Sequence, residues 1–204
     1  VDLEKIKQLG LPFWLAGGYG TAEKLRSALA AGATGVQVGT AFAFCMESGL
    51  RDDYKQALLN KSISGEAEVF TDAMASPTGY PFKAAQLEGT LSEREVYLAR
   101  PRICDLGYLR EPYRSAEGTI EYRCAGEPVS VYLASEGQEE KTVGRKCLCN
   151  ALLANIGHAQ VRGGKYTESG LVTSGDDLSE VQSFLPLNRA GYTAADVIAK
   201  LLES

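Results

Sequence analysis

Helical and strand-like segments alternate across the first third of the chain, and this alternation restricts the possible folds more than any other feature. The predicted elements, in the order helix, strand, helix, strand, helix, helix, span residues 2–9, 12–16, 21–31, 35–39, 42–46 and 52–59. Because strands that alternate with helices across short turns form parallel sheets, the sequence predicts an α/β fold. Both predicted strands are apolar on successive residues, which predicts burial on both faces. Thr21 is placed to cap the helix between them.

The pattern changes near residue 64, after which glycine and proline become frequent. Residues 65–141 are predicted to form long loops with short elements, among them strands at residues 68–71 and 119–123. We therefore expect two domains, with residues 1–64 forming the α/β part and residues 65–204 forming an irregular α+β extension.

Two helices are predicted within this extension. The first spans residues 142–160, with its apolar side formed by Leu148, Leu152 and Ile156. A loop is predicted at residues 163–175. The last helix spans residues 193–203, where Thr193 and Asp196 fit a capping box.

Composition and charge exclude several classes of protein. Of the 204 residues, 45% are hydrophobic and 23% are charged, which is ordinary for a globular protein. The net charge of −5 comes without a basic face, so a nucleic-acid partner is not expected. No apolar stretch reaches the roughly 20 residues of a membrane-spanning helix. We therefore expect a cytoplasmic protein without a membrane partner.

Each of the two predicted strands ends in a glycine-containing turn that leads into a helix. Gly17 and Gly18 follow the first strand, and Gly39 and Thr40 follow the second. Backbone amides at a helix N-terminus carry partial positive charge, and glycine lets a ligand approach the main chain. Because the turns after the last two strands of a parallel barrel often bind phosphate together, an anion is predicted against both turns. The alternative is that these glycines only permit tight turns.

The segments PFWLAGG at residues 12–18 and GATGVQVGTAF at residues 32–42 resemble the nitronate monooxygenase family, formerly called 2-nitropropane dioxygenases. That family consists of FMN enzymes built on a TIM barrel. The resemblance implies that the chain is the C-terminal part of a TIM (β/α)8 barrel, its last two strand–helix units, followed by the irregular extension. It further implies that the FMN phosphate is held by Gly17, Gly18, Gly39 and Thr40, with Gln37 beside the flavin.

The chain also departs from the family's pattern. A complete barrel has eight strands and about 250 residues, and only two such strands are predicted here. In the family the catalytic base is a histidine on a loop before the seventh strand, whereas the single histidine here is His158, far downstream. We therefore expect the C-terminal segment of an FMN-dependent oxidoreductase that oxidises alkyl nitronates with oxygen. Alone, the chain is expected to be inactive and to pair with the missing N-terminal barrel part or with another chain.

Several residues outside the turns allow more than one role. His158 lies at a predicted helix end, where a cap is favoured over a catalytic role. The remaining candidates are four cysteines, which are interpreted as buried free thiols, with zinc or a disulfide as alternatives: Cys104, Cys124, Cys147 and Cys149. Their successive gaps of 20, 23 and 2 residues lack the paired short loops of zinc sites, so no metal site is assigned. Cys45 is expected in the core.

Basic and aromatic residues are interleaved with acidic ones in the extension. The basic ones are Lys83, Arg94, Arg100, Arg102 and Arg110. A solvated, ion-paired surface is favoured, and the alternative places Lys83 or Arg102 at the mouth of the cofactor site. Two further functions stay open. One is another FMN-barrel enzyme such as an enoyl reductase, and the other is a non-catalytic binding or assembly module built on the cysteine-containing region.

Overall fold

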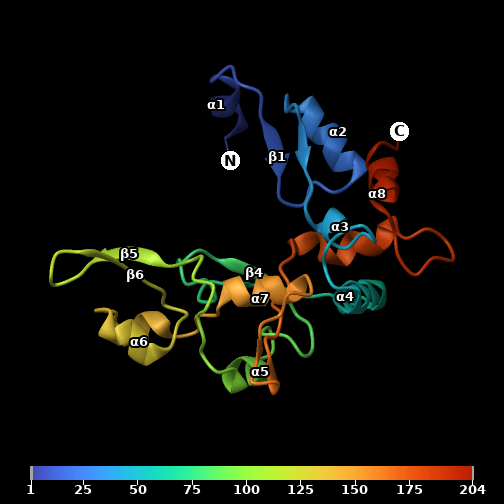
Figure 1. Ribbon diagram of the computed structural model, residues 1–204. Helices are drawn as coiled ribbons and strands as arrows, with labels where there is room; N and C mark the ends of the chain where they lie inside the picture. Colours follow the sequence, from blue (N-terminus) through green and yellow to red (C-terminus); the bar gives the residue numbers. More distant parts are fainter. Residues whose placement is uncertain (1, 204) are drawn as a thin grey trace. The chain divides into compact units, whose positions relative to one another are not determined.

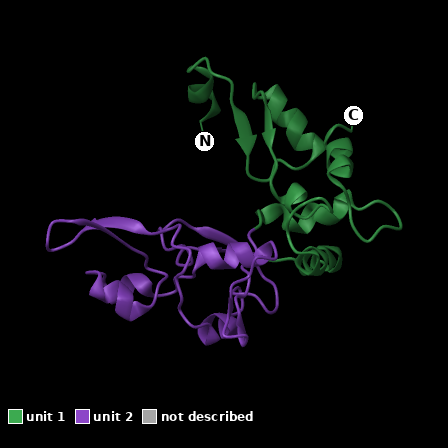
Figure 2. Cartoon of the chain, viewed as in Figure 1, with its two compact units in different colours: residues 1–68, 174–204 green, residues 69–173 purple. Residues whose placement is uncertain are grey.

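A computed structural model describes residues 2–203, and the chain forms two compact units (Figure 2). Unit 1 combines residues 1–68 with residues 174–204, and unit 2 is residues 69–173. The C-terminal segment therefore packs with the N-terminal α/β elements. The predicted domain boundary near residue 64 stays a prediction about the whole protein.

Unit 1 contains the predicted parallel strand pair (Figure 1). Strand β1 pairs with β2 so that Trp14 lies opposite Gly35 and Ala16 lies opposite Gln37. The elements occur in the predicted order: α1 (Leu3–Lys7), β1 (Trp14–Ala16), α2 (Ala22–Ala30), β2 (Gly35–Gln37), α3 (Thr40–Ala43) and α4 (Asp52–Ser64). Because the pair is parallel, the carboxyl ends of both strands, and the turns that follow them, lie at the same edge.

The prediction that both strands are buried on both faces is wrong for this chain. Trp14 is 56% exposed, Ala16 and Gln37 are exposed, and Leu15 and Val36 are only partly covered. The reason is that β1 and β2 form a sheet of two strands. A strand acquires two covered faces only inside a larger sheet with helices on both sides.

The core of unit 1 lies between α4 and the C-terminal elements, namely the 3-10 helix η2 (Asp176–Phe184) and α8 (Ala194–Leu201). Its buried side chains include Leu58, Leu59, Leu178, Val181, Phe184, Tyr192 and Val197. Tyr192 donates a hydrogen bond to the carbonyl of Ala41 at 2.7 Å, which ties α3 to the C-terminal segment. The predicted capping box is confirmed, because Thr193 and Asp196 exchange side-chain and backbone hydrogen bonds.

Unit 2 is built from short hairpins and helices. Its elements are β3 (Val69–Asp72), β4 (Phe82–Ala85), α5 (Arg94–Ala99), β5 (Glu111–Arg114), β6 (Ile120–Arg123), α6 (Val129–Ala134), η1 (Glu139–Thr142), α7 (Leu148–Asn155), β7 (Val161–Arg162) and β8 (Tyr166–Thr167). Two predicted strands, β3 and β6, are confirmed within one residue, and each pairs with an antiparallel neighbour. The fold is mixed α/β with two-stranded sheets, and residues 2–203 contain no complete barrel.

The helix predicted at residues 142–160 is shorter than expected, and a different set of its side chains is buried. It begins only after Cys147, because Gly144 adopts a left-handed backbone (φ 72°) that interrupts a helix. Leu148 packs in the core as predicted, whereas Leu152 and Ile156 are exposed. The core cluster that α7 joins consists of Ala84, Leu91, Leu148, Ala151 and Leu171. Ala151 and Ala154 therefore face the interior together with Leu148, in place of Leu152 and Ile156.

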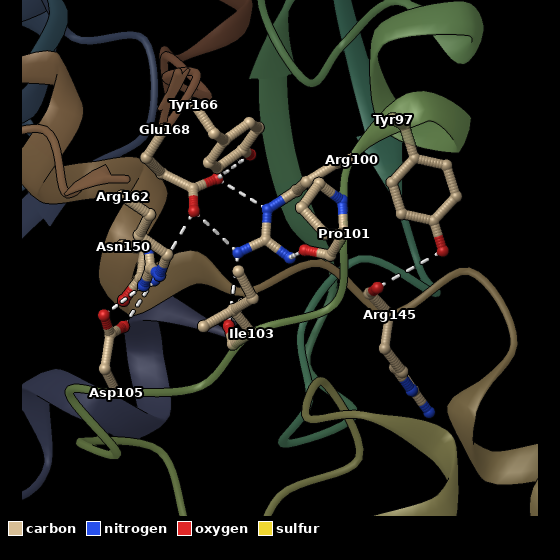
Figure 3. Close-up of polar contacts among 10 residues, drawn as sticks. All are labelled: Tyr97, Arg100, Pro101, Ile103, Asp105, Arg145, Asn150, Arg162, Tyr166 and Glu168. Carbon is tan, nitrogen blue, oxygen red and sulfur yellow. Dashed lines mark hydrogen bonds and ion pairs between the residues drawn. The ribbon is translucent and has the colours of Figure 1, made fainter. Parts of the chain in front are cut away.

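A buried ion pair lies within unit 2 (Figure 3). The Arg100 guanidinium donates two hydrogen bonds to the Glu168 carboxylate, at 2.5 and 2.8 Å, and the two side chains are 5% and 0% exposed. Asn150 and Tyr166 donate to the same carboxylate. The predicted solvated surface is thus wrong for Arg100. The negative charge of Glu168 balances the positive charge of Arg100 inside unit 2.

Candidate functional site

The turns after β1 and β2 form the candidate site of unit 1. Gly17 and Gly18 adopt φ of 88° and 78°, which non-glycine residues rarely adopt. A Cβ atom added to Gly17 or Gly39 would meet no atom within 4 Å. The main chain at both turns is therefore open to close approach by a ligand.

Helix α2 begins next to the first turn. The Thr21 side chain caps it, as predicted, by accepting a hydrogen bond from the Lys24 amide at 3.3 Å. The Lys24 ammonium lies 3.9 Å from the position that a Cβ atom on Gly18 would occupy. It also lies 3.7 Å from the Glu180 carboxylate, which offsets part of its charge. The first turn thus combines helix-end amides with a nearby cation, both of which favour an anion.

The second turn is anchored by a residue from the distant C-terminal segment. The Thr40 hydroxyl donates to Asp177 Oδ1 at 2.6 Å and accepts a hydrogen bond from the Gly175 amide at 3.0 Å. The other carboxylate oxygen of Asp177 lies 3.5 Å from the position of a Cβ on Gly20. One carboxylate therefore stands between the two turns, and it opposes the binding of an anion.

The predicted site residues lie where the sheet topology requires. Gly17, Gly18, Gln37, Gly39 and Thr40 all follow or end the two parallel strands, so they share the carboxyl edge of the pair. Gln37 and Gly39 are exposed, whereas Thr40 is buried. The edge can hold an anion through backbone amides. Cofactor binding by these residues stays a prediction.

Asp177 is the residue that sequence reasoning missed. Asp176 and Asp177 together begin η2. Acidic side chains are common at the start of a helix because their negative charge interacts favourably with the helix dipole. No sequence spacing connects Asp177 to Thr40, because the two lie on different sides of unit 2 in the chain. Only the return of the C-terminal segment to unit 1 brings them together.

His158 has no catalytic surroundings. Its side chain is exposed, and its backbone amide donates to the Leu153 carbonyl at 2.9 Å just beyond α7. The main chain, not the predicted imidazole, therefore satisfies the end of this helix. Arg102 donates to the Thr142 carbonyl at 2.5 Å and so ties the segment after α5 to η1.

The cysteines divide between the units. Cys45 is buried in unit 1, as predicted, and its thiol donates to the Phe42 carbonyl at 3.1 Å. In unit 2 the four other cysteines are free thiols: Cys104, Cys124, Cys147 and Cys149. Between residues 2 and 203, no three or more His, Cys, Asp or Glu side chains are arranged to hold a metal ion. No helix in the same range is long and apolar enough to cross a membrane.

Comparison with known proteins places the chain in a family. The family model described as nitronate monooxygenase matches residues 3–186. A nitronate monooxygenase from Pseudomonas aeruginosa is 38% identical to this chain over 71 residues. That alignment covers 35% of this chain and 20% of the relative, so the chain matches about one fifth of the relative's length.

Proposed function

The chain belongs to the nitronate monooxygenase family, and from this premise we propose that it is the C-terminal segment of an FMN-dependent oxidoreductase that oxidises alkyl nitronates with oxygen. In this proposal β1 and β2 are the last two strands of a TIM barrel. The observation that carries the proposal is the parallel pairing of β1 with β2, which brings two glycine turns to one edge. Phosphate sites of TIM barrels are built from that pair of turns.

The residues at the two turns fit a phosphate through their main chain. The first amides of a helix have no partner within the helix, and they point out of its N-terminus. Gly17 and Gly39 leave open space in front of the backbone, and Lys24 adds a positive charge. Gln37 would lie beside the flavin.

The hydrogen bond to Asp177 determines which atoms of Thr40 remain available to contact the phosphate. Because the Thr40 hydroxyl already donates to Asp177 and accepts from Gly175, its backbone amide is the group left to face the phosphate. The carboxylate thereby fixes the second turn while lowering its affinity for an anion. Bound flavin would supply the electron chemistry, and this chain's residues would position it.

Catalysis would need residues beyond those described. We assign no base from this chain to the proposed flavin site, since its single histidine belongs to unit 2 and the Asp177 carboxylate already accepts the Thr40 hydrogen bond. We therefore propose that the chain acts with the remaining barrel part, supplied by the same protein or by another chain. A positioned acid or base contributes about 10²–10⁴-fold to rate. Alone, the chain would show no turnover above background.

Two measurements test this function. Flavin fluorescence titration of the chain would give an FMN affinity that Gly39→Val lowers at least tenfold, because the valine side chain fills the open space over the turn. Gly49→Val is the matched control, since Gly49 is exposed and also has no atom near its Cβ position. Oxygen uptake with an alkyl nitronate would stay at background for the FMN-saturated chain. Equal FMN affinities for both variants, or robust turnover, would contradict the proposal.

A further inference from the structure

Two carboxylates of η2 lie next to the turns that form the proposed phosphate site. Asp177 Oδ1 accepts the hydrogen bond from the Thr40 hydroxyl at 2.6 Å, at the start of α3. Asp177 Oδ2 lies 3.5 Å from the position that a Cβ atom on Gly20 would occupy, just before α2. Glu180 follows one turn later in η2, and its carboxylate lies 3.7 Å from the Lys24 ammonium. The C-terminal segment therefore places acidic groups beside both turns.

The ionisable side chains at this edge carry a net negative charge. Asp177 and Glu180 supply two carboxylates, whereas Lys24 supplies one ammonium. Asp176 is the acidic neighbour of Asp177 at the start of η2. Burial raises the pKa of Tyr192, whose hydroxyl donates to a carbonyl of α3, so this phenol is neutral and supplies no positive charge. An anion that binds here through main-chain amides is therefore expected to carry as little negative charge as its chemistry allows.

The Asp177 carboxylate is held in place by its surroundings. The Thr40 hydroxyl that donates to it also accepts a hydrogen bond from the Gly175 amide at 3.0 Å. Leu178 and Val181, on the same 3-10 helix, are each 1% exposed in the core of unit 1. Because Thr40 takes Oδ1, Oδ2 is the acceptor that remains for a ligand. An anion without a proton meets this oxygen as a like charge, whereas an anion with an acidic hydroxyl can donate a hydrogen bond to it.

We propose that Asp177 selects a phosphate monoester in its singly charged form, whose P–OH group donates a hydrogen bond to Asp177 Oδ2. This inference rests on the proposed function, since it concerns the same phosphate site. A hydrogen bond between a hydroxyl and a charged oxygen is among the stronger ones in proteins, and a nearby like charge favours the protonated form of an acid. A phosphate monoester loses its second proton near about pH 6. FMN carries such a group. The pyrophosphate of a dinucleotide flavin is a diester without this proton, so the same carboxylate disfavours it.

Inorganic phosphate and sulfate separate proton donation from charge, because both are tetrahedral oxyanions but sulfate keeps no proton near neutral pH. The probe is an amide NMR titration of the ¹⁵N-labelled chain near pH 6 that follows the signals of Gly18 and Thr40. In the wild-type chain, sulfate is expected to bind roughly tenfold more weakly than phosphate. Asp177→Asn is expected to remove this difference, because an amide NH₂ group can donate to either ion.

The pH dependence of FMN binding is the second measurement. Flavin fluorescence titration of the wild-type chain should show an affinity that falls roughly 20-fold from about pH 5.5 to about pH 7.5, as the phosphate loses its second proton. Asp177→Asn should flatten this fall and bind FMN more tightly than the wild-type chain at the higher pH. Glu180→Gln is the matched control, because it removes a carboxylate from the same helix and leaves the proton acceptor in place. It should tighten binding at both pH values and keep the fall.

The outcomes separate this inference from the function on which it rests. Failure of both FMN and phosphate to bind at either pH would contradict the phosphate site itself, and the inference with it. FMN binding that is equal at both pH values or stronger at the higher one would overturn the role of Asp177 and leave the phosphate site standing. Sulfate that binds the wild-type chain as tightly as phosphate would do the same. The last two results need no variant, so they hold even if Asp177→Asn fails to fold.

Discussion

The Thr40 hydroxyl donates a hydrogen bond to Asp177 Oδ1 at 2.6 Å, although 137 positions separate the two residues. This bond joins the turn after β2 to the segment that returns after unit 2. The same carboxylate places a negative charge between two turns that otherwise favour an anion. At the proposed flavin site of unit 1, Asp177 is therefore expected to make the second turn more rigid and to weaken its affinity for phosphate.

Asp177→Asn is predicted to tighten FMN binding. The amide oxygen of asparagine can still accept the Thr40 hydrogen bond, but the charge is gone. At separations of several ångströms near a protein surface, one charge changes binding by roughly two- to tenfold. Flavin fluorescence titration measures the effect, and Asp176→Asn is the control because it removes the same charge one residue away. Weaker binding by Asp177→Asn would show that the charge does not oppose the ligand.

Arg100→Met is predicted to destabilise unit 2 by about 3–5 kcal/mol, because it leaves the fully buried Glu168 carboxylate without its partner. The double variant Arg100→Met, Glu168→Leu is predicted to recover most of this loss, since no unpaired charge remains buried. Urea unfolding followed by circular dichroism gives the free energies. Arg94→Met serves as control, because Arg94 is an exposed arginine at the start of α5, the helix that ends just before Arg100, and should change stability by less than about 0.5 kcal/mol. A double variant as unstable as the single one would contradict this account.

Acid is predicted to weaken unit 2 through Asp72. Burial acts to raise the pKa of this carboxyl, but hydrogen bonds from Lys146 and from the amides of Met74 and Ala75 outweigh it, so the pKa lies below its usual value. In the unfolded chain Asp72 binds a proton near pH 3.9, whereas the folded chain binds it only at lower pH. Its stabilising contribution is therefore complete above about pH 3.9 and is lost as pH falls through the lowered folded value.

Urea unfolding between pH 2 and pH 6 tests this prediction, with the range set by the linkage relation. Lys146→Met should move the loss of stability toward higher pH, because it removes the main group that lowers the Asp72 pKa. Asp72→Asn should flatten the dependence in this window. An unchanged pH profile in both variants would show that other carboxyls dominate.

Under the proposed barrel arrangement, Trp14 is predicted to report the pairing of β1 with a further strand. It is the single tryptophan of the chain, it lies over Gly35 of the neighbouring strand, and it is 56% exposed. Its emission should lie at the long wavelengths of water-exposed tryptophan. Addition of the proposed N-terminal barrel part should shift that emission to shorter wavelengths as a third strand covers the side chain. Complex formation on size-exclusion chromatography without this shift would place the contact elsewhere.

Local signals in the sequence predict much of unit 1. The Thr21 cap, the capping box of Thr193 with Asp196, and the two apolar runs each depend on a few neighbouring residues, and all lie where expected. The face on which a strand is buried depends instead on which other strands surround it. That is why Trp14 is exposed here despite its apolar neighbours.

The contacts that local patterns could not predict join distant segments. Asp177 reaches Thr40, and Glu168 reaches Arg100 across 68 positions, and neither pair has a spacing that sequence reasoning can use. The four cysteines of unit 2 are predicted to be buried thiols, but only Cys124 and Cys147 are buried, because burial depends on which distant segments pack around each side chain.

The most direct test of the phosphate site is an amide NMR titration of the ¹⁵N-labelled chain with FMN, compared with riboflavin, which lacks the phosphate. The account predicts that the amide signals of Gly17, Gly18, Gly39 and Thr40 move with FMN and stay in place with riboflavin. Inorganic phosphate should move the same signals at higher concentration. Identical shifts with FMN and riboflavin, or FMN shifts confined to other residues, would contradict the assignment of these turns as the phosphate site.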